Sequence, residues 1–150
     1  MNETSKINKY IIDDFTSNDL VNTISIVETG LIDLNKENIH PLVNVDLIDA
    51  EVQDDAIIYE FIITAVQKRD INPQAIDSKL LNDSNYLDNI NETLSIAQKF
   101  INRLRRFNND ENIEIVSISN LDFLKDFRGG GLDGVQFTIN LSIHNEDTAS

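Results

Sequence analysis

The sequence contains no cysteine, which excludes disulfides, thiolate metal sites and thiol catalysis. It also lacks a long hydrophobic run, since none of its apolar stretches approaches the roughly 20 residues that a membrane-spanning helix needs. The first residues, Met1 to Lys6, lack the basic start and the apolar stretch of a secretory signal. We therefore expect a soluble protein that is made in the cytoplasm and does not contact a membrane.

Positive charge is scarce, because 12 lysines and arginines face 26 aspartates and glutamates, for a formal net charge of −14. Such a charge repels nucleic acids and anionic membrane surfaces at long range, so we do not expect general binding of nucleic acids. The 150 residues, of which 41% are hydrophobic, can bury one good core but are too few for two ordinary domains. Residues 1–150 are therefore predicted to form a single domain.

Two helices are predicted from apolar residues that recur at spacings of three and four. The first, over residues 5–16, is short and amphipathic, and either Thr4 or Ser5 can cap it. The second, over about residues 85–107, is the clearest element of the sequence. It is expected to bury Leu87, Ile90, Leu94, Ala97, Ile101 and Leu104, with Asn89, Glu92, Gln98 and Arg105 facing away. The pattern is too short for a coiled coil, so a helix laid on a sheet is favoured.

Three strands are predicted between these helices from β-branched or alternating segments. The first covers residues 20–27 and is continued by 31–34 after a bend. The second follows Pro41 and ends at an acidic turn, 49–55. The third, over residues 56–67, is largely apolar on both faces. We expect a helix on one face, and either a neighbouring subunit or the N-terminal helix on the other.

A long loop is predicted over residues 68–84, which contain Pro73 and several aspartates and asparagines. Long loops are often functional, so we expect this one to touch a partner or to fold over an edge of the sheet.

Further strands are predicted after the long helix, over residues 113–119, 121–127 and 135–143. In the first of them, Ile113 and Ile115 are expected on the face opposite Glu114, Val116 and Ile118. The tail, 145–150, is expected to be disordered. The predicted fold class is α+β, a mostly antiparallel sheet backed by the long helix and the short N-terminal helix.

No arrangement of residues in the sequence predicts catalysis. His40 and His144 are too few and too isolated for a metal site or a catalytic triad. The acidic residues of 46–55 lack the glycine and the terminal glutamate of an EF-hand loop, so a solvated face is favoured over a cation site. We expect no enzyme activity, no cofactor and no metal.

The glycine-rich segment 128–134 contains Gly129, Gly130 and Gly131. Bare backbone amides can cradle an anion, but the segment lacks the Gly-Lys-Ser/Thr ending of a phosphate loop and precedes a strand instead of a helix. A mobile hairpin tip is therefore favoured.

A basic group at the end of the long helix, Lys99, Arg103, Arg105 and Arg106, holds a third of the positive charge of the chain. These side chains either meet the acidic surface of an adjacent copy or form a solvated helix end that complements the helix dipole. Both interpretations stay open.

Three segments within residues 41–143, about two thirds of the chain, carry a resemblance to a known family. They are PLVNVDLIDAEVQDDAIIYEFIITAVQKRD (41–70), NYLDNINETLSIAQKFINRLRR (85–106) and LDGVQFTINLSI (132–143). Together they resemble small tail proteins encoded by tailed phages of Bacteroidetes-type hosts. More loosely, the chain is similar to the tail terminators and neck proteins that close the tail tube and join it to the head.

This resemblance implies a structural virion protein, assembled in the bacterial host cytoplasm, with a tail-terminator-like fold and no catalytic residues. It implies a homo-oligomeric ring, usually of six copies, stacked between the tail tube and the head-side connector proteins, with DNA passing through the lumen as cargo. Another neck ring or a tube-like part fits the same resemblance. A small acidic domain that binds a ligand or a metal is the further alternative.

Physical chemistry is compatible with such a ring. An acidic lumen lets DNA slide, because repulsion of the phosphates removes the attractive sites that a basic channel would offer. Ring closure needs a heterologous interface, in which one surface meets a different surface of the next copy. The residues that we predict at this interface are Ile58, Ile62, Val66, Arg103, Arg105, Arg106, Gly129, Gly130 and Gly131.

Overall fold

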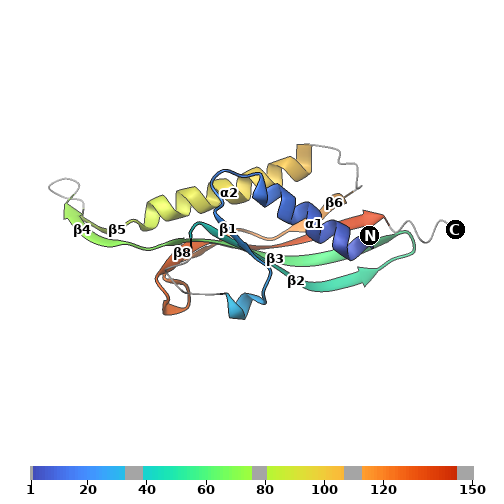
Figure 1. Cartoon of the computed structure of the whole chain (residues 1–150), viewed down its shortest axis with the longest axis horizontal. Coiled ribbons are helices and arrows are strands. Elements are labelled where there is room, and N and C mark those ends of the chain that lie inside the picture. The colour runs from blue at the N-terminus through green and yellow to red at the C-terminus, as the bar shows by residue number, and fades with distance from the viewer. Residues whose placement is uncertain (1, 33–38, 76–80, 107–112, 145–150) are drawn as a thin grey trace.

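Two helices cover one face of a six-stranded sheet in the described part of the chain (Figure 1). The computed structural model describes residues 2–32, 39–75, 81–106 and 113–144, with the backbone alone at 71–75 and 81–83. The elements are α1 (Glu3–Thr16), β1 (Thr23–Ser25), the 3-10 helix η1 (Thr29–Leu31), β2 (Leu42–Val52), β3 (Ala56–Lys68), β4 (Ile71–Ala75), β5 (Leu81–Ser84), α2 (Tyr86–Arg106), β6 (Ile113–Ile118), β7 (Asp122–Leu124), the 3-10 helix η2 (Phe127–Gly129) and β8 (Leu132–His144).

The strand order of this sheet is β1-β2-β3-β8-β6, and β7 also pairs with β8. Strand β1 runs parallel to β2, whereas the other strand pairs of the described ranges are antiparallel. The long strands β3 and β8 pair without a break, from Ala56 opposite His144 to Lys68 opposite Leu132. The predicted fold class, a mostly antiparallel α+β arrangement with one long and one short helix, is confirmed.

Helix α1 begins earlier than predicted because Asn2 is its cap. The side chain of Asn2 accepts a hydrogen bond from the N–H of Ser5 at 2.8 Å, which satisfies one of the free N–H groups of the first turn. Thr4 lies inside the helix, where its hydroxyl is 2.8 Å from the hydroxyl of Tyr59 on β3. The helix is therefore confirmed, but the cap at Thr4 or Ser5 is wrong.

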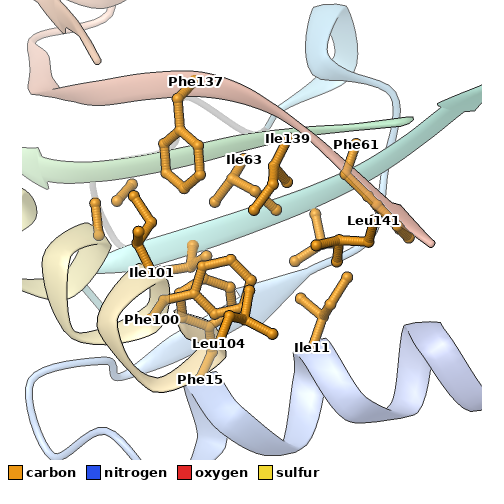
Figure 2. Packing of buried hydrophobic residues seen from close by; sticks show 14 of the residues in the cluster. Ile11, Phe15, Phe61, Ile63, Phe100, Ile101, Leu104, Phe137, Ile139 and Leu141 are labelled. Atoms are coloured by element: carbon orange, nitrogen blue, oxygen red, sulfur yellow. The ribbon is translucent and has the colours of Figure 1, made fainter. Parts of the chain in front are cut away.

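The main core lies between the two helices and the sheet (Figure 2). Helix α1 contributes Ile7, Ile11 and Phe15, which recur every four residues along one face and are fully buried. The ring of Phe15 stacks on Phe100 of α2 with 4.6 Å between the centroids, and Phe100 lies 6.4 Å from the ring of Phe137 on β8. These aromatic contacts join both helices to the middle of the sheet.

The inward face of α2 differs in part from the prediction. As expected, Ile90, Ala97, Ile101 and Leu104 are buried, and Gln98 and Arg105 are exposed. By contrast, Leu87 is 65% exposed, and Asn89, which was expected outside, is only 2% exposed. The buried stripe includes Ile96 and Phe100. In the first turn of α2 it is Asn89, and not Leu87, that points inward. Its side-chain amide belongs to a buried polar network around Asp133, described below.

The segment that was predicted as a strand over residues 20–27 and 31–34 is bound largely by side chains of β2. Within it, Thr23–Ser25 pairs with β2, whereas Thr29–Leu31 forms η1. The side chain of Asn44 accepts the N–H of Val27 at 3.1 Å and donates to its carbonyl at 2.9 Å, and Asp46 accepts the N–H of Thr29 at 2.8 Å. The predicted strand is therefore confirmed at Thr23–Ser25, whereas its continuation is wrong, because these side chains take up the backbone groups that a strand would pair. Residues 33 and 34 lie outside the described residues.

Two predicted connections are shorter because strands continue into them. Strand β2 extends to Val52, so the acidic turn narrows to residues 53–55. The predicted loop 68–84 contains β4 and β5, which pair as a two-stranded ribbon that projects past the start of α2 (Figure 1). The prediction of a loop without structure is wrong for these strands, and residues 76–80 lie outside the described residues.

A bulge in β6 corrects the predicted faces of this strand. The register shifts between Ile115 and Ser117, so that Ile118 pairs with Ile139 and packs against the main core, while Val116 is exposed. Because the bulge adds one residue to the strand, Ile118 points toward the core, although simple alternation would turn it outward. Downstream, the strand predicted over 121–127 is limited to β7. The predicted end of the long helix at 107 and the tail 145–150 lie outside the described residues.

A second, smaller hydrophobic cluster lies on the opposite face of the sheet, which we call the outer face. It contains Ile32, Leu42, Val66 and Leu132, with Leu124 and Phe127 packed against it. Figure 1 shows η1 and η2 on this side of the sheet and both helices on the other side. The prediction that the N-terminal helix can cover the second face of β3 is therefore wrong, because α1 shares the face of α2.

Candidate interaction surfaces

The outer face carries rows of polar residues beyond the second cluster, where β2, β3, β8 and β6 run side by side. The register places Asp49 opposite Glu60, and Glu60 opposite Asn140, in one row. The next row runs through Glu51, Ile58, Ser142 and Glu114. We call the four carboxylates of the two rows the acidic patch: Asp49, Glu51, Glu60 and Glu114. An open depression of about 170 Å³ is lined by three of them together with Ala50, Ile58 and Asn140.

No lysine or arginine of the sheet lies beside the acidic patch. Strands β2, β6, β7 and β8 contain neither lysine nor arginine, and β3 has only Lys68 at its last position. Like charges directly opposite each other on neighbouring strands destabilise a sheet, and Asp49 faces Glu60 in this way. A cation from elsewhere would relieve this repulsion.

The predicted interface residues of β3 are found in two environments. Ile58 and Ile62 are half-buried on the open part of the outer face, and neither belongs to the two hydrophobic clusters of the described residues. Val66 is 0% exposed because residues near η1 and η2 cover it. Val66 is therefore not available to a partner in this structure, and its place in the predicted interface is corrected.

The end of α2 exposes a cluster of cations that we call the basic end: Lys99, Arg105 and Arg106. The sequence contains no aspartate or glutamate from residue 93 to residue 106. No ion pair with a carboxylate of the described residues involves these three side chains. Their positive charge complements the C-terminal end of the helix dipole, but they stay open to a partner.

Arg103 differs from its three neighbours because it joins the two helices. Its guanidinium donates to the Ser17 hydroxyl at 2.7 Å and lies 3.5 Å from the carboxylate of Asp14. Burial raises the pKa of Asp14, and the nearby Arg103 lowers it in part. Arg103 therefore has partners within its own chain, which neither the predicted subunit contact nor the predicted solvated helix end included.

The glycine-rich segment is tied down by hydrogen bonds. The N–H of Gly131 donates to the side chain of Asp126 at 2.7 Å, and the N–H of Gly129 donates to the carbonyl of Asp126 at 2.8 Å. The Arg128 guanidinium donates to the carbonyls of Gly30 and Ile32 near η1. The segment does connect the paired strands β7 and β8, as a hairpin should. It leaves Gly129 exposed and buries Gly131.

A buried carboxylate, Asp133, organises the same end of the sheet. Arg69 donates to both of its oxygens, with distances of 2.7 to 3.1 Å. The amide of Asn89 at 3.2 Å and the backbone N–H of Asp126 at 2.9 Å also donate to it. Burial by itself raises the pKa of Asp133, but these hydrogen bonds outweigh burial and hold the pKa below its ordinary value.

This network fastens the base of the β4–β5 ribbon. Arg69 and Asp70 lie between β3 and β4, and Asn85 lies between β5 and α2. The N–H of Asp70 donates to the side chain of Asn85 at 2.7 Å, and the side chains of Asn85 and Asn89 donate to the carbonyl of Lys68. Sequence reasoning missed this network, although a lone aspartate between Leu132 and Gly134 is an unusual start for a buried strand.

The structure does not bring the histidines together. His144 pairs with Ala56 at the start of β3. His40 precedes Pro41 and Leu42, and Leu42 pairs with Val66 near the other end of β3. Of the acidic residues of 46–55 that were weighed as a cation site, Asp46 accepts hydrogen bonds from the N–H and the hydroxyl of Thr29. Within the described ranges, no group of three or more histidines and carboxylates is arranged to hold a metal ion.

The fold is an α+β domain in which two helices cover one face of the sheet. On the other face, only the second hydrophobic cluster is covered by described residues. No model of a known protein family matches the chain, and no curated protein sequence is significantly similar to it. No helix of the described ranges is both long and apolar enough to cross a membrane.

Proposed function

We propose that the chain is a structural subunit of a homo-oligomeric ring that terminates the tail tube of a tailed phage and joins it to the head-side connector. The class of assembly comes from the resemblance of residues 41–70, 85–106 and 132–143 to phage tail proteins. Six copies are the usual number for such rings. DNA passes through the lumen as cargo, and the net charge of −14 keeps it from sticking.

The observation that carries this proposal is the open part of the outer face. Ile58 and Ile62 lie there half-buried, on a sheet whose other face packs against α1 and α2. Apolar side chains that are bordered by polar residues on an open sheet are typical of a contact between proteins. A ring needs such a surface on each copy, together with a different surface on the next copy.

The open edge of β2 adds a second site for contacts. Strand β1 pairs with Leu42–Asn44, whereas residues 47–52 continue along the edge of the sheet and pair on this side with no strand of the described ranges. Unpaired strand edges are places where another chain can add itself, and charged side chains such as Asp49 and Glu51 limit unspecific pairing. This edge therefore favours an ordered neighbour over aggregation.

The proposal is tested by the oligomeric state of the purified protein. We expect sedimentation velocity and negative-stain electron microscopy to show closed rings, alone or with added tail-tube or connector protein. Ile58→Glu should reduce the ring fraction, because it places a charge in the contact. Leu87→Glu is the matched control, since Leu87 is exposed on the helical side. A protein that stays monomeric at high concentration, also with these partners, would overturn the proposal.

A further inference from the structure

We infer that the basic end of α2 in one copy docks on the acidic patch of the next copy. This inference rests on the proposed ring and specifies its contact. It names the occupant of the outer face, a second copy of this chain, and the chemistry that recognises it, paired guanidinium and carboxylate groups.

The acidic patch calls for a cationic partner. Asp49 and Glu60 face each other across β2 and β3, and no lysine or arginine of the sheet lies among them. Repulsion between such cross-strand carboxylates is present in each isolated copy. A partner that brings cations removes this repulsion and gains attraction as well.

The basic end offers those cations. Lys99, Arg105 and Arg106 are exposed and make no ion pair with a carboxylate of the described residues. Arginine presents several N–H donors in one plane and binds carboxylates through two parallel hydrogen bonds. In a protein with 26 acidic and 12 basic side chains, such a carboxylate-free stretch is the natural counterpart of a carboxylate cluster.

The two surfaces cannot meet within one copy. The acidic patch lies on the outer face, whereas α2 packs on the opposite face of the same sheet (Figure 1). A contact between them therefore joins different copies through different surfaces. Such a heterologous contact repeats from copy to copy and closes into a ring when the rotation between copies allows it.

Half-buried Ile58 suits the contact because it lies between the carboxylates. In its row, Ile58 pairs with Glu51 on one side and Ser142 on the other. The aliphatic stem of an arginine or lysine can pack on such a side chain while its charged end reaches the carboxylates. Burial of the stem adds an apolar part to a contact that is otherwise ionic.

Charge reversal tests this inference. We expect Arg105→Glu/Arg106→Glu and, separately, Asp49→Lys/Glu60→Lys to weaken self-association by roughly tenfold or more each. The control, Lys9→Glu/Lys125→Glu, matches the first variant in net charge but changes cations outside the basic end, so it should keep the wild-type rings. Thermal melts followed by circular dichroism check that every variant is folded.

Mixing the two reversed variants gives the decisive measurement. The first variant has two acidic surfaces and the second has two basic surfaces, so each surface of one is complementary to a surface of the other. An equimolar mixture should form rings in which the variants alternate, although neither variant assembles alone. A folding defect would not be repaired by mixing.

The outcomes separate this inference from the proposed function. A wild type that forms rings, with reversed variants that also form rings, would overturn the inference and leave the ring in place. A mixture that stays monomeric would also overturn the inference. A wild type that stays monomeric under all conditions would overturn both. Weaker rings of wild type at high salt are expected as well, because salt screens exposed charges.

Discussion

Arg69 and Asp133, 64 positions apart in the sequence, form an ion pair through both carboxylate oxygens, with 2.7 Å between Nη2 and Oδ1. The pair stands where β3 leaves the sheet for the β4–β5 ribbon. The carboxylate is 0% exposed, and only 15% of the arginine side chain is exposed. One buried carboxylate therefore connects the ribbon, the start of α2 and the beginning of β8.

Asp133→Asn is expected to lower the free energy of unfolding by about 3 kcal/mol, because removing one partner leaves the other charge buried without compensation. Urea unfolding followed by circular dichroism measures this change. The control is Asp13→Asn, which breaks the exposed pair with Lys9 and should cost no more than about 0.5 kcal/mol. Equal losses in both variants would contradict the role assigned to Asp133.

The pH dependence of stability gives a second test of Asp133. Its folded pKa lies below the ordinary value of 3.8, so its stabilisation is complete above that value and is lost as the pH falls through the folded pKa. The difference in unfolding free energy between wild type and Asp133→Asn should therefore be constant near neutral pH and shrink below pH 3.8. Asp14, whose pKa is raised, acts with the opposite sign, but it is present in both proteins and cancels. A difference that grows on acidification would contradict this assignment.

The sequence predicts those parts of the fold in which the local pattern and the tertiary contacts agree. Strand β8 alternates between buried and half-buried residues from Val135 to Ile143, so its faces follow from periodicity. The β4–β5 ribbon was missed because Pro73 and its polar neighbours look like a loop, and its strands pair mainly with each other. Burial of Val66 depends on η1 and η2, which are remote in sequence.

Some of the candidate surfaces could be predicted from the sequence, and others could not. The basic end and the half-buried pair Ile58 and Ile62 follow from local sequence, since their character depends on neighbours in the same element. The acidic patch depends on register, because Glu60 and Glu114 come from strands other than that of Asp49. Local patterns do not contain this information. The partners of Arg103 lie on α1 and were hidden for the same reason.

Phe100→Ala should cost about 3 to 5 kcal/mol, because it leaves a cavity between α1, α2 and β8. The control is Leu87→Ala in the same helix, which the sequence pattern places inward but which is 65% exposed. Its loss should stay below about 1 kcal/mol, since little apolar area is uncovered. Thermal and urea unfolding measure both changes. If Leu87→Ala lost as much stability as Phe100→Ala, Leu87 would have to be buried, as the sequence pattern predicts.

Calcium and magnesium at millimolar concentration are expected to leave the Tm unchanged, because the described residues contain no group arranged to hold a metal ion. Any ligand that binds the folded state alone raises the Tm, and the rise grows with the logarithm of its concentration above the Kd. Differential scanning fluorimetry with each ion, and with common nucleotides, measures this directly. A clear rise would favour the alternative of a small ligand- or metal-binding domain.

Gly134→Ala is expected to destabilise the domain by about 3 kcal/mol or more, which is the upper range for overpacking. A Cβ at this position would lie 1.8 Å from the carbonyl oxygen of Ala65 and 2.9 Å from the Cα of Val66. These are backbone atoms of β3, which pairs with β8 along its whole length and cannot withdraw locally. The glycine is therefore required by close approach of two strands.

Gly30→Ala is the matched control for this change. A Cβ at Gly30 would meet no atom within 4 Å, and its backbone lies outside the left-handed region that favours glycine. We expect its unfolding free energy to stay within about 0.5 kcal/mol of wild type, as for most surface substitutions. If Gly134→Ala proved equally neutral, β3 and β8 would have to separate at this position. That outcome would also move Asp133, the neighbouring residue, and weaken its pair with Arg69.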